Sequence, residues 1–110
     1  MKRKIQIDLD AVLNEYGKEP YDENCIPKIK DGAADFIKEL SKIAELYLFT
    51  SRNLLLSSKC LINNNLDKYF TDVTNVKLPS YLYIDDRCIC FKGNYKMTLE
   101  EVKAFKVYWK

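Results

Sequence analysis

Three short apolar segments, each followed at once by acidic or hydroxyl side chains, constrain this chain more than any other feature. They span residues 5–9, 46–49 and 81–84 and are bounded by polar or turn residues. Segments of this length, rich in Ile, Leu, Phe and Tyr, are typical of buried β-strands. Because near-continuous apolar strands need cover on both faces, the pattern favours a sheet enclosed by other elements.

Helical patterns separate these strands. Asp31 is the expected N-cap of a first helix, with Asp35 in its first turn, where the helix dipole favours an acid. A second helix is predicted after Asn53, ending within residues 63–65. Alternating strands and helices predict an α/β fold, a three-layer Rossmann-like parallel sheet with helices on both faces. The apolar residues of the first helix recur at helical spacing: Ala33, Phe36, Ile37, Leu40 and Ile43.

The later part of the chain has weaker signals. Thr98 and Glu101 form a capping-box pattern that predicts a third helix. Further short strands are expected at 70–76, 88–91 and 107–109. In the strand expected at 88–91, the side chains of Cys88 and Cys90 would point to the same face, and we expect both to belong to the core.

Length and composition favour one domain that spans residues 1–110. The chain has 110 residues, 47% of them hydrophobic, which is enough for a single core and leaves little room for a second. No repeat or low-complexity linker divides it. Residues 14–30 form its one long irregular connection, and long connections of this kind often carry function.

Charge and composition exclude several classes of function. A net charge of +2 is too small to indicate nucleic-acid binding by itself. With no histidine in the chain, catalytic triads and His-ligated zinc are excluded. The four cysteines lack zinc-site spacing, and we expect reduced thiols. No secretion signal or membrane span is expected, so the predicted location is cytoplasmic.

Reactive side chains follow several of the predicted strands. In an open parallel sheet, ligands bind beyond the carboxyl ends of the strands, so these positions are the ones that matter. The candidates are Asp8 and Asp10 after the first strand, Thr50, Ser51 and Arg52 after the second, Lys77 before the last, and Asp85, Asp86 and Arg87 after it.

In this order, the candidates resemble the four motifs of the haloacid dehalogenase superfamily of phosphohydrolases. The family has a strand followed by Asp-x-Asp-x-Thr or Val, a strand ending in Thr or Ser, a lysine, and a strand ending in an acidic pair. The resemblance covers residues 5–87. The matching residues are Asp8, Asp10 and Val12, then Thr50, then Lys77, and finally Asp85 and Asp86.

The resemblance implies a role for each motif residue. Asp8 would be the nucleophile that forms an aspartyl-phosphate, and Asp10 would protonate the leaving oxygen and later activate water. Thr50 would bind a phosphoryl oxygen, and Lys77 would offset the negative charge.

Converging carboxylates repel one another unless a cation neutralises them, and oxygen-only ligands favour a hard ion such as Mg²⁺. We therefore expect magnesium as the cofactor. The resemblance adds Asp10 to the expected metal shell through its backbone carbonyl. The predicted metal-binding residues are Asp8, Asp10, Asp85 and Asp86.

The sequence departs from the family pattern at three positions. Ala11 stands where many members have glycine, and Val12 replaces the commoner threonine. Lys77 is followed closely by Pro79, which leaves no helix between this lysine and the next strand. Lys59 and Lys92 are alternatives for the motif lysine, although Lys77 directly precedes the fourth-motif strand.

Substrate contacts are predicted for Ser51, Arg52 and Arg87, together with Thr50, while a structural ion pair stays an equal alternative for each arginine. The gaps between motifs are too short for a cap domain, so the site should be open. The expected substrate is a phosphorylated small molecule or nucleic-acid end, with nucleotides slightly favoured. Tyr16 and Tyr21 lie in the irregular loop where the family places its substrate-facing flap; we expect hydrophobic cover from these rings, with stacking on a base as the alternative.

Two other functions are consistent with parts of the pattern. One is a catalytically silent domain that keeps the fold and binds a phosphorylated partner, although all four motif acids are present. The other is a response-regulator receiver, which also uses aspartates, threonine, lysine and magnesium. A receiver places its acidic pair after the first strand, so the order of residues here disagrees with it.

Overall fold

The sheet confirms the α/β prediction and is parallel throughout. The computed structural model describes residues 2–110, and its four strands lie in the order β3-β2-β1-β4. All three strongly predicted strands form, and the weaker signal at 70–76 also proves to be a strand. The bounds are Arg3–Asp8 for β1, Ala44–Phe49 for β2, Phe70–Thr74 for β3 and Leu82–Ile84 for β4.

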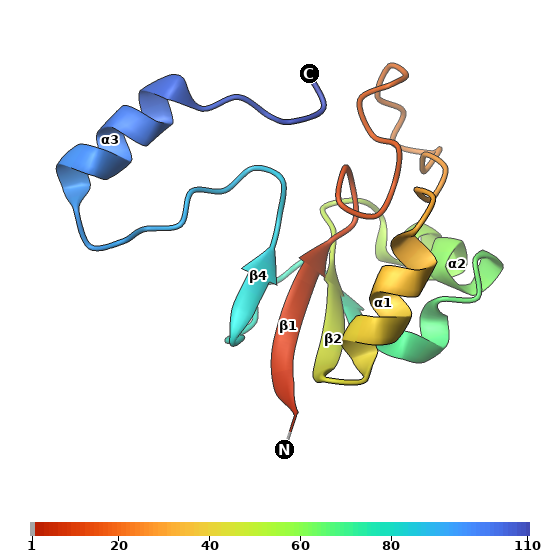
Figure 1. Cartoon of the computed structure of the whole chain (residues 1–110). Coiled ribbons are helices and arrows are strands. Elements are labelled where there is room, and N and C mark those ends of the chain that lie inside the picture. Colours follow the sequence, from red (N-terminus) through yellow and green to blue (C-terminus); the bar gives the residue numbers. More distant parts are fainter. Residues whose placement is uncertain (1) are drawn as a thin grey trace.

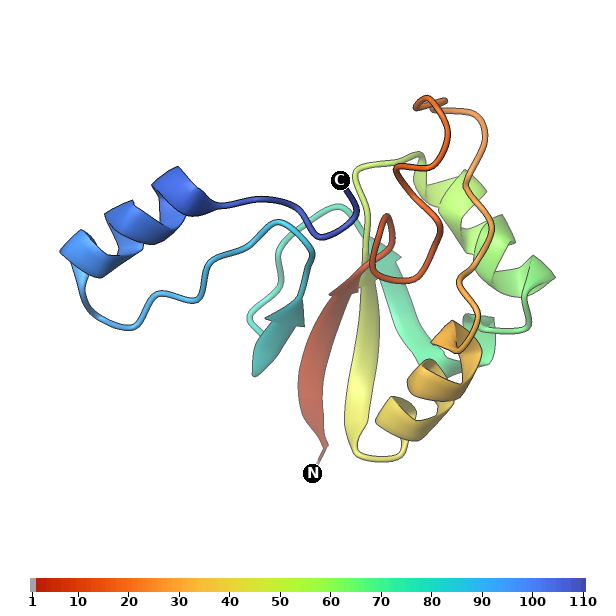
Figure 2. The ribbon, with the colours of Figure 1, turned by 45° about the horizontal axis from the view of Figure 1, so that its top comes forward.

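Two helices cover one face of this sheet. Helix α1, Ala33–Ser41, connects β1 to β2, and helix α2, Leu54–Asn63, leads from β2 towards β3. Both connections move the chain in the same direction across the sheet. Because the two crossovers have the same handedness, both helices lie on the same face. Figures 1 and 2 show α1 and α2 together on that side. A short 3₁₀ turn, Asp67–Tyr69, completes the second connection.

The core lies between this face and the two helices. Ile5 and Ile7 of β1 alternate with Gln6 and pair in register with Leu46 and Leu48 of β2. These four aliphatic side chains are buried. Each contributes about 1.5–3 kcal/mol of hydrophobic stabilisation. The period-two pattern of β1 therefore assigns Ile5 and Ile7 to the helical face and Gln6 to the opposite one.

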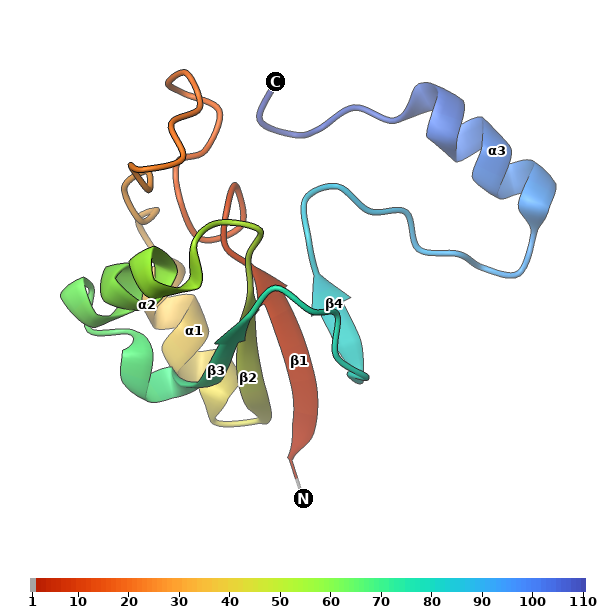
Figure 3. The same ribbon diagram turned by 180° about the vertical axis from the view of Figure 1, so that it is seen from behind.

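The opposite face is crossed by a connection without a helix, residues 75–81. This connection returns from β3 over β2 and β1 to reach β4, as Figure 3 shows from behind. Gln6, only 2% exposed, holds it in place. Its side-chain amide donates to the carbonyl of Val76 (2.7 Å) and its carbonyl accepts from the amide of Leu78 (3.1 Å). Both polar ends of a buried glutamine are thus satisfied by the connection that it clamps.

The third helix does not build the second helical layer that the sequence predicts. Helix α3, Tyr95–Ala104, lies beyond β4 and projects away from the sheet (Figure 1). Its apolar side chains Leu99 and Val102 are exposed. Within residues 2–110, the helices that pack on the sheet therefore occupy one face. In the same part of the chain, no helix has the length and apolar character needed to cross a membrane.

Two predicted helix starts are wrong by one or a few residues, while a third is correct. Gly32, with φ of 88°, is the N-cap of α1 in place of Asp31, and the left-handed backbone there suits glycine. Helix α3 begins after Asn94, whose side chain accepts from the amide of Met97, so Thr98 lies inside the helix. Helix α2 begins directly after Asn53 as predicted, and the Asn53 side chain caps it by accepting from the amide of Leu56.

The strands predicted at 88–91 and 107–109 do not form. The chain leaves the sheet immediately after β4, so residues 88–91 have no neighbouring strand with which to pair. Cys88 and Cys90 are therefore exposed, and the prediction that they belong to the core is wrong. In the last of these segments, Tyr108 and Trp109 are held by side-chain hydrogen bonds instead.

Gln6→Leu should destabilise the protein by about 1–3 kcal/mol, because the leucine fills the same space but leaves the Val76 carbonyl and the Leu78 amide without partners. Urea unfolding followed by circular dichroism measures the loss. Lys59→Ala, on the exposed side of α2, is the control and should stay within about 0.5 kcal/mol of wild type. A Gln6→Leu protein as stable as this control would contradict the clamp.

Candidate functional site

Three carboxylates converge at the carboxyl ends of β1 and β4. Asp8 is the last residue of β1, and Asp85 and Asp86 follow Ile84, the last residue of β4. The pairing of Ile7 with Ile84 brings the next residues of both strands side by side. One oxygen from each of the three aspartates lies within 4.8 Å of the others. The sheet topology, not a local motif, therefore assembles this cluster.

The cluster is electrostatically strained around Asp8. Burial raises the pKa of Asp8 from 3.8 to about 8, with further contributions from the charge of Asp85 and from a hydrogen bond with the Asp86 side chain. Each of these effects favours the neutral acid over the carboxylate. In the part of the chain that the structure describes, neither Asp8 nor Asp85 has a Lys or Arg nitrogen within ion-pairing distance.

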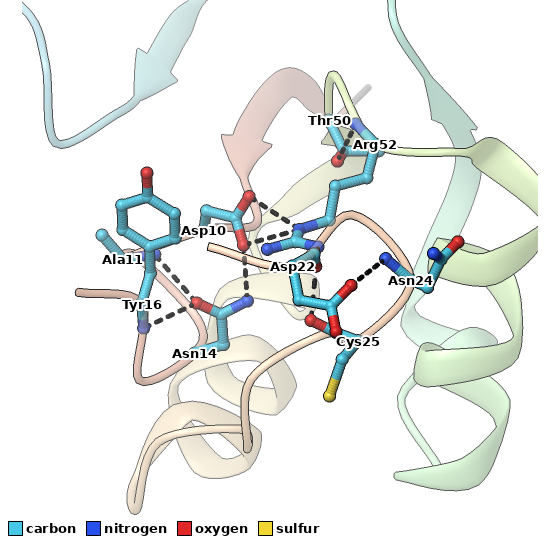
Figure 4. Close-up of polar contacts among 9 residues, drawn as sticks. All are labelled: Asp10, Ala11, Asn14, Tyr16, Asp22, Asn24, Cys25, Thr50 and Arg52. Carbon is cyan, nitrogen blue, oxygen red and sulfur yellow. Dashed lines mark hydrogen bonds and ion pairs between the residues drawn. The ribbon is translucent and has the colours of Figure 1, made fainter. Parts of the chain in front are cut away.

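The negative charge of Asp10, in contrast, is neutralised by Arg52, which follows the carboxyl end of β2. The Nε of Arg52 donates to both carboxylate oxygens of Asp10, at 3.1 and 2.9 Å (Figure 4). The side-chain amide of Asn14 donates to the same carboxylate at 2.9 Å. Since the Arg52 side chain is only 1% exposed, its charge needs this partner. The structural ion pair that the sequence left open for Arg52 is therefore present.

Arg52 also fastens the long connection of residues 14–30. Its Nη1 donates to the backbone carbonyls of Asp22 (2.9 Å) and Cys25 (3.4 Å), and its guanidinium lies 4.8 Å from the ring centre of Tyr21. One buried cation thus joins Asp10 to the segment that the sequence marked as a functional loop.

The turn after Asp10 adopts a left-handed backbone at Ala11, with φ of 68°. The side-chain carbonyl of Asn14 accepts from the amides of Ala11 (3.0 Å) and Tyr16 (3.1 Å) and so holds this turn (Figure 4). The glycine common at this position in the family would adopt the conformation without strain.

A cavity of about 450 Å³ opens over the cluster. It brings together most of the predicted site residues and two tyrosines of the 14–30 connection. Thr50, by comparison, is buried beneath the rim, where its hydroxyl accepts from the amide of Arg52 at 3.0 Å. The residues that line the cavity are Asp8, Asp10, Tyr16, Tyr21, Ser51, Asp85, Asp86 and Arg87.

Lys77 lies in a second cavity, of about 580 Å³, on the sheet face opposite the helices. This cavity also reaches Asp8, and Phe49 and Tyr83 line its wall. The Nζ of Lys77 lies 4.6 Å from the ring centre of Tyr83. No ion pair links Lys77 to a carboxylate within residues 2–110, so the structure brings this lysine near Asp8 without engaging it.

Three residues near the site were missed by the sequence analysis. Asn14 follows Asp10 by four residues, a spacing that could have marked it as a partner. Gln6 holds the connection that carries Lys77. Trp109 donates its indole N–H to Asp86, and nothing near it in the sequence indicates this contact.

Comparisons with known proteins agree with the fold and leave the function open. No family model and no curated protein matches the sequence. A solved structure of a conserved protein from Bacteroides thetaiotaomicron is similar, with a TM-score of 0.61 and 20% identity. The likeness covers 98% of this chain and 95% of that one. At this identity it shows a shared fold over the whole chain.

The residues of the cluster fit a hard divalent cation. All three donors are carboxylate oxygens, which suit Mg²⁺ better than softer metals. A cation among Asp8, Asp85 and Asp86 would stabilise the Asp8 carboxylate, whose pKa is raised by burial and by the charge of Asp85. Because Asp85 is exposed, one side of the aspartate cluster is open to a ligand.

Without metal, stability should fall as the pH rises from about 4 to about 8. In that range the unfolded chain has lost the Asp8 proton, while the folded protein, with its pKa raised to about 8, still binds it. Asp8→Asn removes this penalty and should raise the Tm at pH 9 by several degrees, with little effect at pH 4.

Thermal unfolding in chelator across this pH range checks this expectation. Asp31→Asn, which changes an exposed acid outside the cluster, is the matched control and should follow wild type at every pH. Equal Tm values for Asp8→Asn and wild type at pH 9 would argue against a strained Asp8.

Proposed function

We propose that this protein is a magnesium-dependent phosphomonoester hydrolase of the haloacid dehalogenase type, working through an aspartyl-phosphate on Asp8. The convergence of Asp8, Asp85 and Asp86 at the ends of two adjacent parallel strands carries the proposal. The order of the strand-end residues and the placement of Asp10 in the same cavity as Asp8 support it.

In the first step, a carboxylate oxygen of Asp8 attacks phosphorus and the bond from phosphorus to the leaving oxygen breaks. Asp10 lines the same cavity and supplies the proton to that oxygen. Bound Mg²⁺ would keep Asp8 ionised and neutralise charge on the phosphoryl group. Arg87 lines the cavity with its side chain 58% exposed and its Nε 3.9 Å from Oδ2 of Asp86, and it would bind a phosphate oxygen.

In the second step, water attacks the phosphorus of the aspartyl-phosphate, which releases inorganic phosphate and regenerates Asp8. Asp10 accepts the proton from this water. Arg52 and Asn14 hold the Asp10 carboxylate in one orientation for both steps. Thr50 is proposed to donate its hydroxyl to a phosphoryl oxygen, and Lys77 to offset charge after turning from Tyr83.

The proposed substrate is a phosphorylated small molecule or nucleic-acid end. The cavity is open, and its rim carries the aromatic rings of Tyr16 and Tyr21, which would stack on a base. Four free cysteines, three of them exposed, fit a reducing compartment, and we propose a cytoplasmic location.

Hydrolysis of an aryl phosphate, with Mg²⁺ or with chelator, tests the proposal. We expect turnover that requires the metal and that Asp8→Asn reduces by at least about a thousandfold, while Asp31→Asn retains it. A panel of nucleotides and 3'-phosphorylated oligonucleotides then defines the substrate. If the folded protein binds the phosphate ester but shows no metal-dependent turnover, the proposed enzyme activity is wrong and the protein is a phosphate-binding domain.

Asp10→Asn should separate the two steps. An aryl leaving group departs without a proton, so the variant should still form the aspartyl-phosphate from an aryl phosphate. It should then accumulate this intermediate, because water activation is lost, and hydroxylamine should release the phosphate. Circular dichroism checks that the chain stays folded although Arg52 has lost the carboxylate of Asp10 as its partner. Failure to accumulate a phosphorylated protein would assign Asp10 another role.

A further inference from the structure

The segment that follows α3 returns to the aspartate cluster and docks there through two side chains. The indole Nε1 of Trp109 donates to Oδ2 of Asp86 at 2.7 Å. The hydroxyl of the neighbouring Tyr108 donates to the backbone carbonyl of Ala11. Figure 2 shows this end of the chain lying beside the ends of the central strands. The segment thus contacts the loops after both β1 and β4.

The indole is closely packed around this hydrogen bond. The ring of Tyr16 meets it edge-on, with 5.0 Å between ring centres, and the guanidinium of Arg87 lies 5.3 Å from its centre. A Cβ at Gly17 would fall 2.5 Å from Cε3 of Trp109. The absence of a side chain at Gly17 therefore makes room for the indole.

We propose that Trp109 is a positioning residue that fixes the Asp86 carboxylate for divalent-cation binding, an inference that rests on the proposed function. The Asp86 side chain is only 5% exposed, so an N–H from the protein restrains it where water has little access. Hydrogen bonds to a ligating carboxylate set its orientation, and their loss typically weakens metal binding by about 10–100-fold.

Trp109→Phe keeps an aromatic ring and removes the N–H together with part of the volume of the indole. The concentration of Mg²⁺ that gives half of the maximal rise in Tm should increase by about tenfold or more, with Tm in chelator close to that of the control. The kcat at saturating Mg²⁺ should stay near wild type, a separation that general loosening of the fold would not produce.

Tyr108→Phe is the matched control. It removes the other docking hydrogen bond, from the adjacent residue, without touching Asp86. Its Mg²⁺ midpoint should stay within about twofold of wild type. If Tyr108→Phe shifts the midpoint as far as Trp109→Phe does, docking of the segment matters in general and the specific role of the indole N–H is overturned.

Wild-type fluorescence provides a second measurement, because Trp109 is the one tryptophan of the chain. Paramagnetic Mn²⁺ should quench this fluorescence saturably, chelator should reverse the effect, and Asp86→Asn should weaken it. Mn²⁺ binding that raises Tm without quenching would overturn the placement of Trp109.

The metal titrations need no turnover, so the two proposals fail in distinguishable ways. Mg²⁺ binding that Trp109→Phe leaves unchanged overturns the positioning role alone. Mg²⁺ binding weakened by Trp109→Phe in a protein without phosphatase activity supports the positioning role and overturns the proposed function. No Mg²⁺ binding by wild type overturns both.

Discussion

The site depends on three aspartates being held together against their own repulsion. Pairing of β1 with β4 brings Asp8 beside Asp85 and Asp86, and burial together with the charge of Asp85 raises the pKa of Asp8. Strand β4 is only three residues long, so backbone pairing alone is a weak restraint on its loop. Side-chain contacts from Trp109 add what the short strand lacks.

A second charge balance, between Asp10 and Arg52, divides the acidic residues into two kinds. Asp10 is paired with a buried guanidinium and also bonded by Asn14, whereas Asp8 lies among other acids. Two carboxylates separated by one residue thus occupy opposite electrostatic environments. Arg87 at the cavity is more exposed than Arg52, and its Nε lies 3.9 Å from Oδ2 of Asp86.

The sequence predicts most accurately those features that depend on a single strand and the residues at its end. The short apolar runs of β1 and β2 identified both strands and placed Asp8 and Thr50 at or just beyond their ends. Features that depend on which strands pair in the folded protein were predicted wrongly, since residues 88–91 have strand-like composition but no partner strand. The second helical layer was expected from the α/β pattern, yet the β3 to β4 connection crosses the sheet without a helix.

The residues that sequence reasoning missed share a physical cause. Gln6 bonds a carbonyl 70 positions away, and Trp109 bonds a carboxylate 23 positions away. Such partners are chosen by the folded geometry and leave no periodicity or spacing behind. The groups proposed to react are recognisable because they terminate strands, whereas the groups that hold them in place are not. The Gln6 clamp matters for the same reason, because it holds the connection that carries Lys77 against the face that Asp8 shares.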